Sequence, residues 1–255
     1  MTYQYVLLTI SGLIWGSFLG AVVWRLDDIK TIFKSRSKCD HCDAELNWYD
    51  IIPLVSFGIL RGKCRKCRKN ISFLYPLIEI LTAALFVMVY LKWGISYEAI
   101  LLVLILSTAI VTLGYDAIHM QIIDQVVWLG IVLTLVLDAI VSKGQYWEAL
   151  RIYGYGALIG VGLPIILVVP SKAKWMGEGD ILIGLLVGLL VGFPGVLVAL
   201  IIALLTGSIF GVGQIILKRK TIKDPIAFGP FMILGAMLAY FAGSNIISWY
   251  MGLLK

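Results

Sequence analysis

The chain has 255 residues, of which 60% are hydrophobic and only 14% are charged, and its net charge is +6. A chain with a mean hydropathy of +0.96 cannot bury this much apolar surface inside a soluble globule, so the composition predicts a polytopic membrane protein. The positive charge is interpreted as membrane topology and lipid contact, and it requires no nucleic acid as a partner.

Apolar runs of about 20 residues, the length that crosses roughly 30 Å of hydrocarbon, recur along the whole chain. This pattern predicts an all-α fold of about eight transmembrane helices. The first run lacks a basic residue before it and is followed by Arg25, so we expect a retained span and not a cleaved signal. The runs lie near 4–23, 74–91, 98–115, 122–141, 154–170, 196–217 and 227–250, and a shorter one, a half-span or re-entrant piece, fills 181–192.

Lysine and arginine predict the orientation of these spans. The 24–73 loop holds 11 of the 21 basic residues, and the loops at 171–180 and 218–225 raise the total on one face to 17. By the positive-inside rule this face is cytoplasmic. We therefore expect a first transmembrane helix over 1–23, a cytoplasmic loop over 24–73 and a transmembrane domain over 74–255.

All four cysteines lie in the 24–73 loop, as Cys39-x-x-Cys42 and Cys64-x-x-Cys67. Two such knuckles, with 21 residues between them, are typical of zinc ribbons, in which four thiolates form a tetrahedral site. Two disulfides or four free thiols are the alternatives, although disulfides rarely persist in a reducing compartment. The sequence predicts that zinc, or another thiophilic metal, stabilises a loop that has little core of its own.

Basic side chains surround the second knuckle. Lys63, Arg65 and Lys66 are expected to lower the thiol pKa values and so to favour metal loading. His41 lies inside the first knuckle and could replace a cysteine as a ligand, but it is interpreted as a solvated spacer because four thiolates already complete the metal's shell.

Two carboxylates stand at the ends of apolar runs: Asp116 in Gly-Tyr-Asp and Asp180 in Gly-Glu-Gly-Asp. A carboxylate at a bilayer boundary costs desolvation energy, so a pair of them indicates a function. Both would reach the cytoplasmic boundary, where paired carboxylates can share one proton and activate a water molecule. Asp180 could instead only cap the next helix, but the flanking glycines favour an irregular, water-accessible setting.

Four other polar residues near these spans have less specific interpretations. We expect Asp124 to be a helix cap or a partner of the acid pair, and His119 to be an exposed loop residue. Asp138 is expected to pair with Lys143. Glu79 lies one turn into the 74–91 run, where it either faces the acid pair or bonds a neighbouring helix.

Further motifs accompany the cysteines and aspartates in a definite order. They are Gly16-Ser17-Phe18-Leu19 with Arg25-Leu26, Tyr49-Asp50-Ile51-Ile52-Pro53-Leu54, Arg61-Gly62-Lys63-Cys64, Tyr75-Pro76-Leu77-Ile78-Glu79 and Phe228-Gly229-Pro230-Phe231. Over nearly its full length the chain resembles the type IV prepilin peptidases (prepilin leader peptidase/N-methyltransferases), which are membrane aspartic proteases of the GxGD kind. The 74–255 part would then be the aspartic peptidase domain.

The resemblance implies that the chain cleaves the short basic leader of type IV prepilins or pseudopilins after glycine, at the cytoplasmic face of a prokaryotic inner membrane. Asp116 and Asp180 match the two catalytic aspartates. S-adenosylmethionine would then methylate the new N-terminus, and Gly62 and Lys63 match positions that the family associates with this step. The chain departs from the family pattern at three positions: Gly20 replaces Asn, Ile123 replaces Pro and Leu182 replaces Lys.

Three alternatives remain open from the residues alone. A transporter could use the two acids as a proton or cation relay, but this would not explain the cysteines. A presenilin-like or signal-peptide-peptidase-like protease would share the GxGD motif but would lack a cysteine loop after the first span. A metal-dependent assembly factor with inert aspartates is the third.

Overall fold

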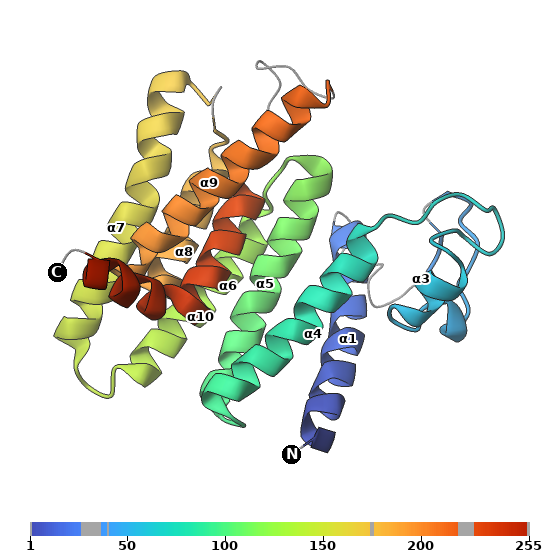
Figure 1. Ribbon diagram of the computed structural model, residues 1–255, viewed down its shortest axis with the longest axis horizontal. Helices are drawn as coiled ribbons and strands as arrows, with labels where there is room; N and C mark the ends of the chain where they lie inside the picture. The colour runs from blue at the N-terminus through green and yellow to red at the C-terminus, as the bar shows by residue number, and fades with distance from the viewer. Residues whose placement is uncertain (1, 27–36, 40, 174–175, 219–226, 254–255) are drawn as a thin grey trace. The chain divides into compact units, whose positions relative to one another are not determined.

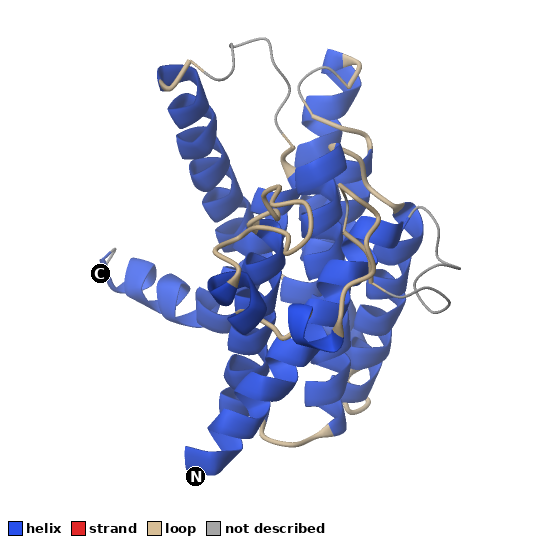
Figure 2. Ribbon diagram, turned by 90° about the vertical axis from the view of Figure 1, so that its right-hand side faces the viewer, coloured by secondary structure: helices blue, strands red, loops and turns tan. Residues whose placement is uncertain are grey.

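The computed structural model describes residues 2–26, 37–39, 41–173, 176–218 and 227–253, and its regular elements are all helices (Figures 1 and 2). The predicted all-α fold is confirmed: two isolated β-bridges occur, but the described residues contain no strand. Seven described helices are long and apolar enough to span a membrane. They are α1 (Thr2–Arg25), α4 (Leu74–Trp93), α5 (Tyr97–His119), α6 (Asp124–Val141), α7 (Tyr146–Ser171), α9 (Gly195–Ile216) and α10 (Gly229–Leu253).

The eighth apolar helix, α8 (Gly179–Val191), has only 13 residues. At 1.5 Å per residue it is about 20 Å long, which is shorter than the hydrocarbon core of a bilayer. The short run in the sequence therefore predicted this half-length helix. The chain divides into two compact units, Met1–Ala99 and Ile100–Lys255.

In the first unit, α1 and α4 pack side by side (Figure 1). Glycine allows the close approach: a Cβ on Gly12 would lie 2.7 Å from the Cα of Ala83, and one on Gly16 would lie 2.7 Å from the Cα of Glu79. Small residues four apart are the usual way in which membrane helices bring their backbones together. The Trp24 ring also stacks on Tyr75 of α4, with the ring centroids 4.0 Å apart.

The described part of the cysteine loop belongs to the same unit. It contains a short 3-10 helix, η2 (Trp48–Asp50), and a five-residue helix, α3 (Val55–Ile59). These helices lie between the two cysteine knuckles in the chain. The sequence showed the apolar residues of this segment but not that they form helices.

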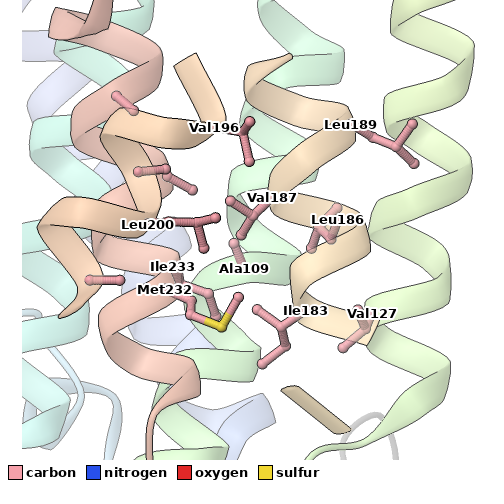
Figure 3. Close-up of a cluster of buried hydrophobic side chains, with 14 of the residues drawn as sticks. Ala109, Val127, Ile183, Leu186, Val187, Leu189, Val196, Leu200, Met232 and Ile233 are labelled. Atoms are coloured by element: carbon pink, nitrogen blue, oxygen red, sulfur yellow. The ribbon is translucent and has the colours of Figure 1, made fainter. Parts of the chain in front are cut away.

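In the second unit, α8 packs against α6, α7, α9 and α10. Its contact with α7 is made by glycine backbones: a Cβ on Gly160 would collide with the carbonyl oxygen of Gly184, and one on Gly156 would collide with that of Gly188. Both helices therefore carry glycines four residues apart, facing one another. Figure 3 shows that side chains of α8 also join a buried apolar cluster, which includes Val127, Ile183, Leu186, Val187, Leu200, Met232 and Ile233.

Candidate active site and metal centre

Three helix ends bring Asp116 and Asp180 together in the second unit. Asp116 lies in the last turn of α5, Asp180 in the first turn of α8, and Gly229 begins α10. A Cβ on Gly229 would lie 2.6 Å from Oδ2 of Asp116 and 3.4 Å from Oδ1 of Asp180. The two carboxylates therefore converge on one point, and only a residue without a side chain leaves that point open.

The glycines before Asp180 have separate roles. The Gly177 N–H donates to Oδ2 of Asp180 at 3.1 Å. Gly179 lies against Ile122, because a Cβ added to Gly179 would be only 2.9 Å from the Cβ of Ile122. Oδ1 of Asp180 is buried and has no hydrogen-bond partner among the described residues. A buried carboxylate oxygen without a partner is costly unless it shares a proton or meets a water molecule. This oxygen is also the one that faces the point above Gly229.

Both aspartates are shielded from solvent, since each side chain is only 4% exposed. The other acid predicted near them, Asp124, lies in the first turn of α6 and is exposed. His119 is exposed as predicted, but it ends α5 instead of lying in a loop, and its ring stacks on Tyr115. Neither residue shares the buried position of the aspartate pair.

The predicted pairing of Asp138 with Lys143 is wrong. No ion pair joins the two among the described residues, and Oδ2 of Asp138 is buried without a hydrogen-bond partner there. The chain turns at Ser142 and Lys143 after α6, where Lys143 adopts a positive φ of 45° and α6 ends. Asp138 and Lys143 are close in the sequence, but the turn after α6 does not bring them into an ion pair.

The two cysteine knuckles in the first unit have the same backbone geometry. In each, the N–H of the first cysteine donates to the carbonyl of the fifth residue after it, and the N–H of the fourth residue donates back to the cysteine carbonyl, at 2.9 to 3.0 Å. That fourth residue has a positive φ in both knuckles, 51° at Asp43 and 61° at Arg68. A β-bridge closes each turn, from residue 38 to 45 and from residue 63 to 70.

This geometry fits a four-thiolate metal site. The sulfur atoms of Cys39, Cys42, Cys64 and Cys67 lie within 4.8 Å of one another, and Sγ of Cys39 is 3.9 Å from Sγ of Cys67. A tetrahedral zinc with Zn–S bonds of about 2.3 Å needs sulfurs about 3.8 Å apart. His41 is exposed and is not among these ligands, which agrees with its role as a spacer.

Thiol acidity in the cluster has a different cause from the predicted one. The backbone N–H of Cys67 donates to the Cys64 sulfur and lowers the pKa of that thiol to about 7, and the N–H of Lys66 adds to the effect. Burial raises the pKa of the Cys39 thiol to about 11. The sequence attributed the lower pKa to the basic side chains, whereas the turn itself supplies it.

Two polar contacts hold the loop in place. Oε2 of Glu79, on α4, accepts a hydrogen bond from the Leu54 N–H at 2.8 Å. Nε of Arg65 donates to Oδ1 of Asp50 at 2.8 Å, which ties the second knuckle to η2, and its guanidinium lies 5.1 Å from the centre of the Tyr49 ring. The Ser17 hydroxyl of α1 also donates to the Glu79 carboxylate. Glu79 therefore bonds a neighbouring helix, as one of the two interpretations from the sequence predicted, and it bonds the loop as well.

The positions that depart from the family pattern are accommodated locally. Gly20 faces Tyr75, whose Cδ1 would be 3.3 Å from an added Cβ. Leu182 packs against the apolar cluster of α8, and Ile123 precedes α6 in an extended conformation. None of the three replaces a carboxylate or a cysteine of the two sites.

Comparison with known proteins decides the family. A family model described as Bacterial Peptidase A24 N-terminal domain matches residues 10–93, which include α4 and both knuckles. The prepilin leader peptidase/N-methyltransferase of Bacillus subtilis (strain 168) is 30% identical over 247 residues, 96% of this chain and 96% of that protein. The chain belongs to the prepilin leader peptidase/N-methyltransferase family. The resemblance found in the motifs is thereby confirmed.

Other members of this family are similar over most of their length. The type 4 prepilin-like proteins leader peptide-processing enzyme of Escherichia coli O78:H11 is 31% identical, and the match covers 91% of each chain. The prepilin leader peptidase/N-methyltransferase of Legionella pneumophila is 27% identical over 98% of this chain and 95% of that protein. No solved structure shows significant similarity to the chain.

Proposed function

We propose that the chain is an intramembrane aspartic endopeptidase that removes the basic leader of type IV prepilins or pseudopilins after glycine and then methylates the new N-terminus. The observation that carries the proposal is the convergence of Asp116 and Asp180 on one point above Gly229. Membership of a family whose relatives are named prepilin leader peptidase/N-methyltransferase supports the choice of substrate.

The proposed cleavage divides acid and base work between the two carboxylates. The ionised carboxylate takes a proton from a water molecule, while the protonated one donates to the scissile carbonyl oxygen. The water oxygen bonds to the carbonyl carbon, and the carbon–nitrogen bond then breaks as a proton passes to the leaving nitrogen. The unpartnered Oδ1 of Asp180 supports this assignment, because such an oxygen can share the proton that the pair requires.

The place of the aspartates suits a prepilin. Asp116 ends one apolar helix and Asp180 begins another, so both carboxylates lie at the end of a membrane-embedded segment. A prepilin combines a polar, basic leader with a hydrophobic helix, so its scissile bond lies at this depth. The concentration of 17 of the 21 basic residues in loops on the aspartates' side of the predicted topology supports the cytoplasmic face as the place of cleavage.

Methylation and metal binding complete the proposal. S-adenosylmethionine supplies an electrophilic methyl group, which the new terminal amine takes with loss of one proton while the carbon–sulfur electron pair stays on sulfur. Cys39, Cys42, Cys64 and Cys67 would hold a structural zinc ion, which stabilises the loop between α1 and α4.

Substitution of each carboxylate tests the cleavage. With purified protein in lipid and a prepilin substrate, Asp116→Asn and Asp180→Asn should each lower the cleavage rate by about 1,000-fold or more, because one carboxylate cannot serve as both acid and base. Asp124→Asn is the matched control, since Asp124 is exposed, and it should cleave within about threefold of the unsubstituted protein. More than a few per cent of activity in Asp116→Asn or Asp180→Asn would remove that aspartate from the mechanism.

A further inference from the structure

A cavity of about 560 Å³ lies in the first unit, among α1, α4 and the cysteine loop. Its volume is that of a small-molecule site, which typically measures about 300–1,000 Å³. The lining combines aromatic, acidic and basic side chains from every element of the unit, including Trp24, Asp50, Arg65, Tyr75 and Glu79.

Glu79 is the buried acid of this cavity. Its side chain is only 7% exposed, one carboxylate oxygen accepts the Leu54 N–H at 2.8 Å, and the Ser17 hydroxyl also donates to the carboxylate. No lysine or arginine forms an ion pair with Glu79 among the residues that the structure describes. A buried carboxylate without a cationic partner is unfavourable, and a cationic ligand in the cavity would compensate its charge.

An aromatic wall accompanies the carboxylate. Trp24 and Tyr75 are stacked at 4.0 Å with an interplanar angle of 16°, and both rings line the cavity. Aromatic faces attract cations and stack on heterocycles. Lys38 and Lys69 also line the cavity and are exposed, so they can bind an anionic group at its rim.

The residues that the family resemblance associates with methylation, Gly62 and Lys63, lie elsewhere. Neither Gly62 nor Lys63 belongs to the described lining of the cavity. Gly62 has a positive φ of 69° and would place a Cβ 3.1 Å from the Phe57 ring, and Lys63 is exposed. Gly62 therefore serves the turn before the second knuckle, while the cavity offers a concave surface of the size that a small ligand needs.

We propose that this cavity is the binding site for the methyl donor, with Glu79 as the counter-charge of the sulfonium and the Trp24–Tyr75 pair as the aromatic surface. S-adenosylmethionine carries a cationic sulfur, an adenine ring and a carboxylate, and the lining has a group of matching chemistry for each. The inference rests on the proposed methyl transfer, and it assigns that reaction to the first unit.

The charge of the ligand provides the test. S-adenosylhomocysteine has the same adenine and amino-acid groups but a neutral sulfur, so a carboxylate beside the sulfur favours S-adenosylmethionine over it. Dissociation constants of both compounds are measured by isothermal titration calorimetry with the full-length protein in lipid nanodiscs. Glu79→Gln removes the charge but keeps an oxygen for the Leu54 N–H, and Glu148→Gln, at an exposed acid of α7, is the matched control.

In Glu79→Gln, binding of S-adenosylmethionine should weaken by about 10-fold, which is the order expected for a lost charge-assisted contact, while binding of S-adenosylhomocysteine stays within about twofold. Trp24→Ala should weaken both compounds, and Trp147→Ala, at a residue that is 81% exposed, should weaken neither. Unchanged metal content and thermal midpoint show that each variant is folded.

Three results would overturn the proposal. Equal losses for the two compounds in Glu79→Gln would mean that Glu79 only anchors the loop. Normal binding in Glu79→Gln and Trp24→Ala, with a loss in Lys63→Ala, would move the donor site to Lys63 and leave the methyl transfer intact. Unsubstituted protein that neither binds S-adenosylmethionine nor methylates a pre-cleaved pilin would reject the methyl transfer and this site together.

Discussion

At Gly229 the backbone of α10 lies against both carboxylates, so this residue determines how Asp116 and Asp180 meet. A side chain there would have to occupy the point on which Oδ2 of Asp116 and Oδ1 of Asp180 converge. That point is also where a water molecule or a substrate carbonyl must enter in the proposed reaction. In the proposed reaction, the absence of a side chain at Gly229 therefore gives access to the pair.

Gly229→Ala should therefore lower prepilin cleavage by at least about 10-fold with little change in protein yield. The added methyl group would lie 2.6 Å from Oδ2 of Asp116, so the carboxylate must move. Gly213→Ala in α9 is the control, because no atom lies within 4 Å of its added Cβ. Equal cleavage by the two variants would show that the space above Gly229 is not used.

The sequence identified the residues with a strong chemical signature but not those that act through position. The four cysteines stood out by spacing, and the structure brings them together. The importance of Gly229 was visible only as part of a motif, because its reason is a contact between residues far apart in the chain. The contact of Glu79 with the Leu54 N–H could not be predicted, since a backbone donor carries no sequence signal.

Among the elements, the two knuckles are duplicates of one turn, each with a cysteine sulfur beside backbone N–H groups. The duplication explains why the sulfurs of two segments can surround one ion. It also makes a prediction about metal and pH, because protons and metal compete for the same thiolates.

Protein purified without chelator should contain about one zinc ion per chain, and Cys64→Ser should lose it. The affinity should fall steeply as the pH is lowered through about 7, because the Cys64 thiol, with a pKa of about 7, then also becomes protonated and metal binding must release its proton as well. Elemental analysis and calorimetry in buffers of different ionisation enthalpy measure both effects. His41→Ala should keep the metal; a metal-free, folded protein would show that the knuckles are stable without it.

The α7–α8 pair depends on glycine backbones in contact. Gly160→Ala should destabilise the second unit by roughly 1–3 kcal/mol, because its Cβ would collide with the Gly184 carbonyl. Gly162→Ala lies two residues further along α7, where no atom is within 4 Å of the added Cβ, and it should be neutral or slightly stabilising. Thermal unfolding in one detergent compares the two variants, and equal midpoints would contradict the packing described.

The hydropathy pattern predicted the presence of each long helix, but it placed the ends of some helices several residues away from where they lie. The run at 154–170 became α7, which begins at Tyr146 because Tyr146–Tyr153 continue the helix despite two charged residues. The run at 98–115 became α5, which continues to His119 and so places Asp116 inside the helix. A hydropathy window stops at charges, whereas a helix stops where its backbone loses hydrogen-bond partners.

The molecule has two compact units, Met1–Ala99 and Ile100–Lys255, and each is proposed to carry one of the two reactions. The cavity and the cysteine cluster belong to the first, and the aspartate pair belongs to the second. Cleavage must precede methylation only because it creates the amine that is methylated. The two reactions should therefore be separable.

Asp180→Asn should fail to methylate a full-length prepilin but should methylate a pre-cleaved pilin at a rate within about twofold of the unsubstituted protein. The physical reason is that a carboxylate outside the first unit has no part in transfer from a sulfonium. Incorporation of a radiolabelled methyl group measures both substrates. Loss of methylation with pre-cleaved pilin as well would mean that the aspartate pair serves both reactions.

In the proposed mechanism Asp116 and Asp180 act as one unit, and single-turnover cleavage of a prepilin by Asp116→Asn, Asp180→Asn and the double variant distinguishes this from two independent contributions. If the carboxylates share one proton and one water molecule, the double variant should be no slower than the slower single variant, because either substitution already removes the whole acid–base pair. Losses that multiply in the double variant, or a single variant that cleaves at a rate close to that of the unsubstituted protein, would mean that the two carboxylates do not act as one unit.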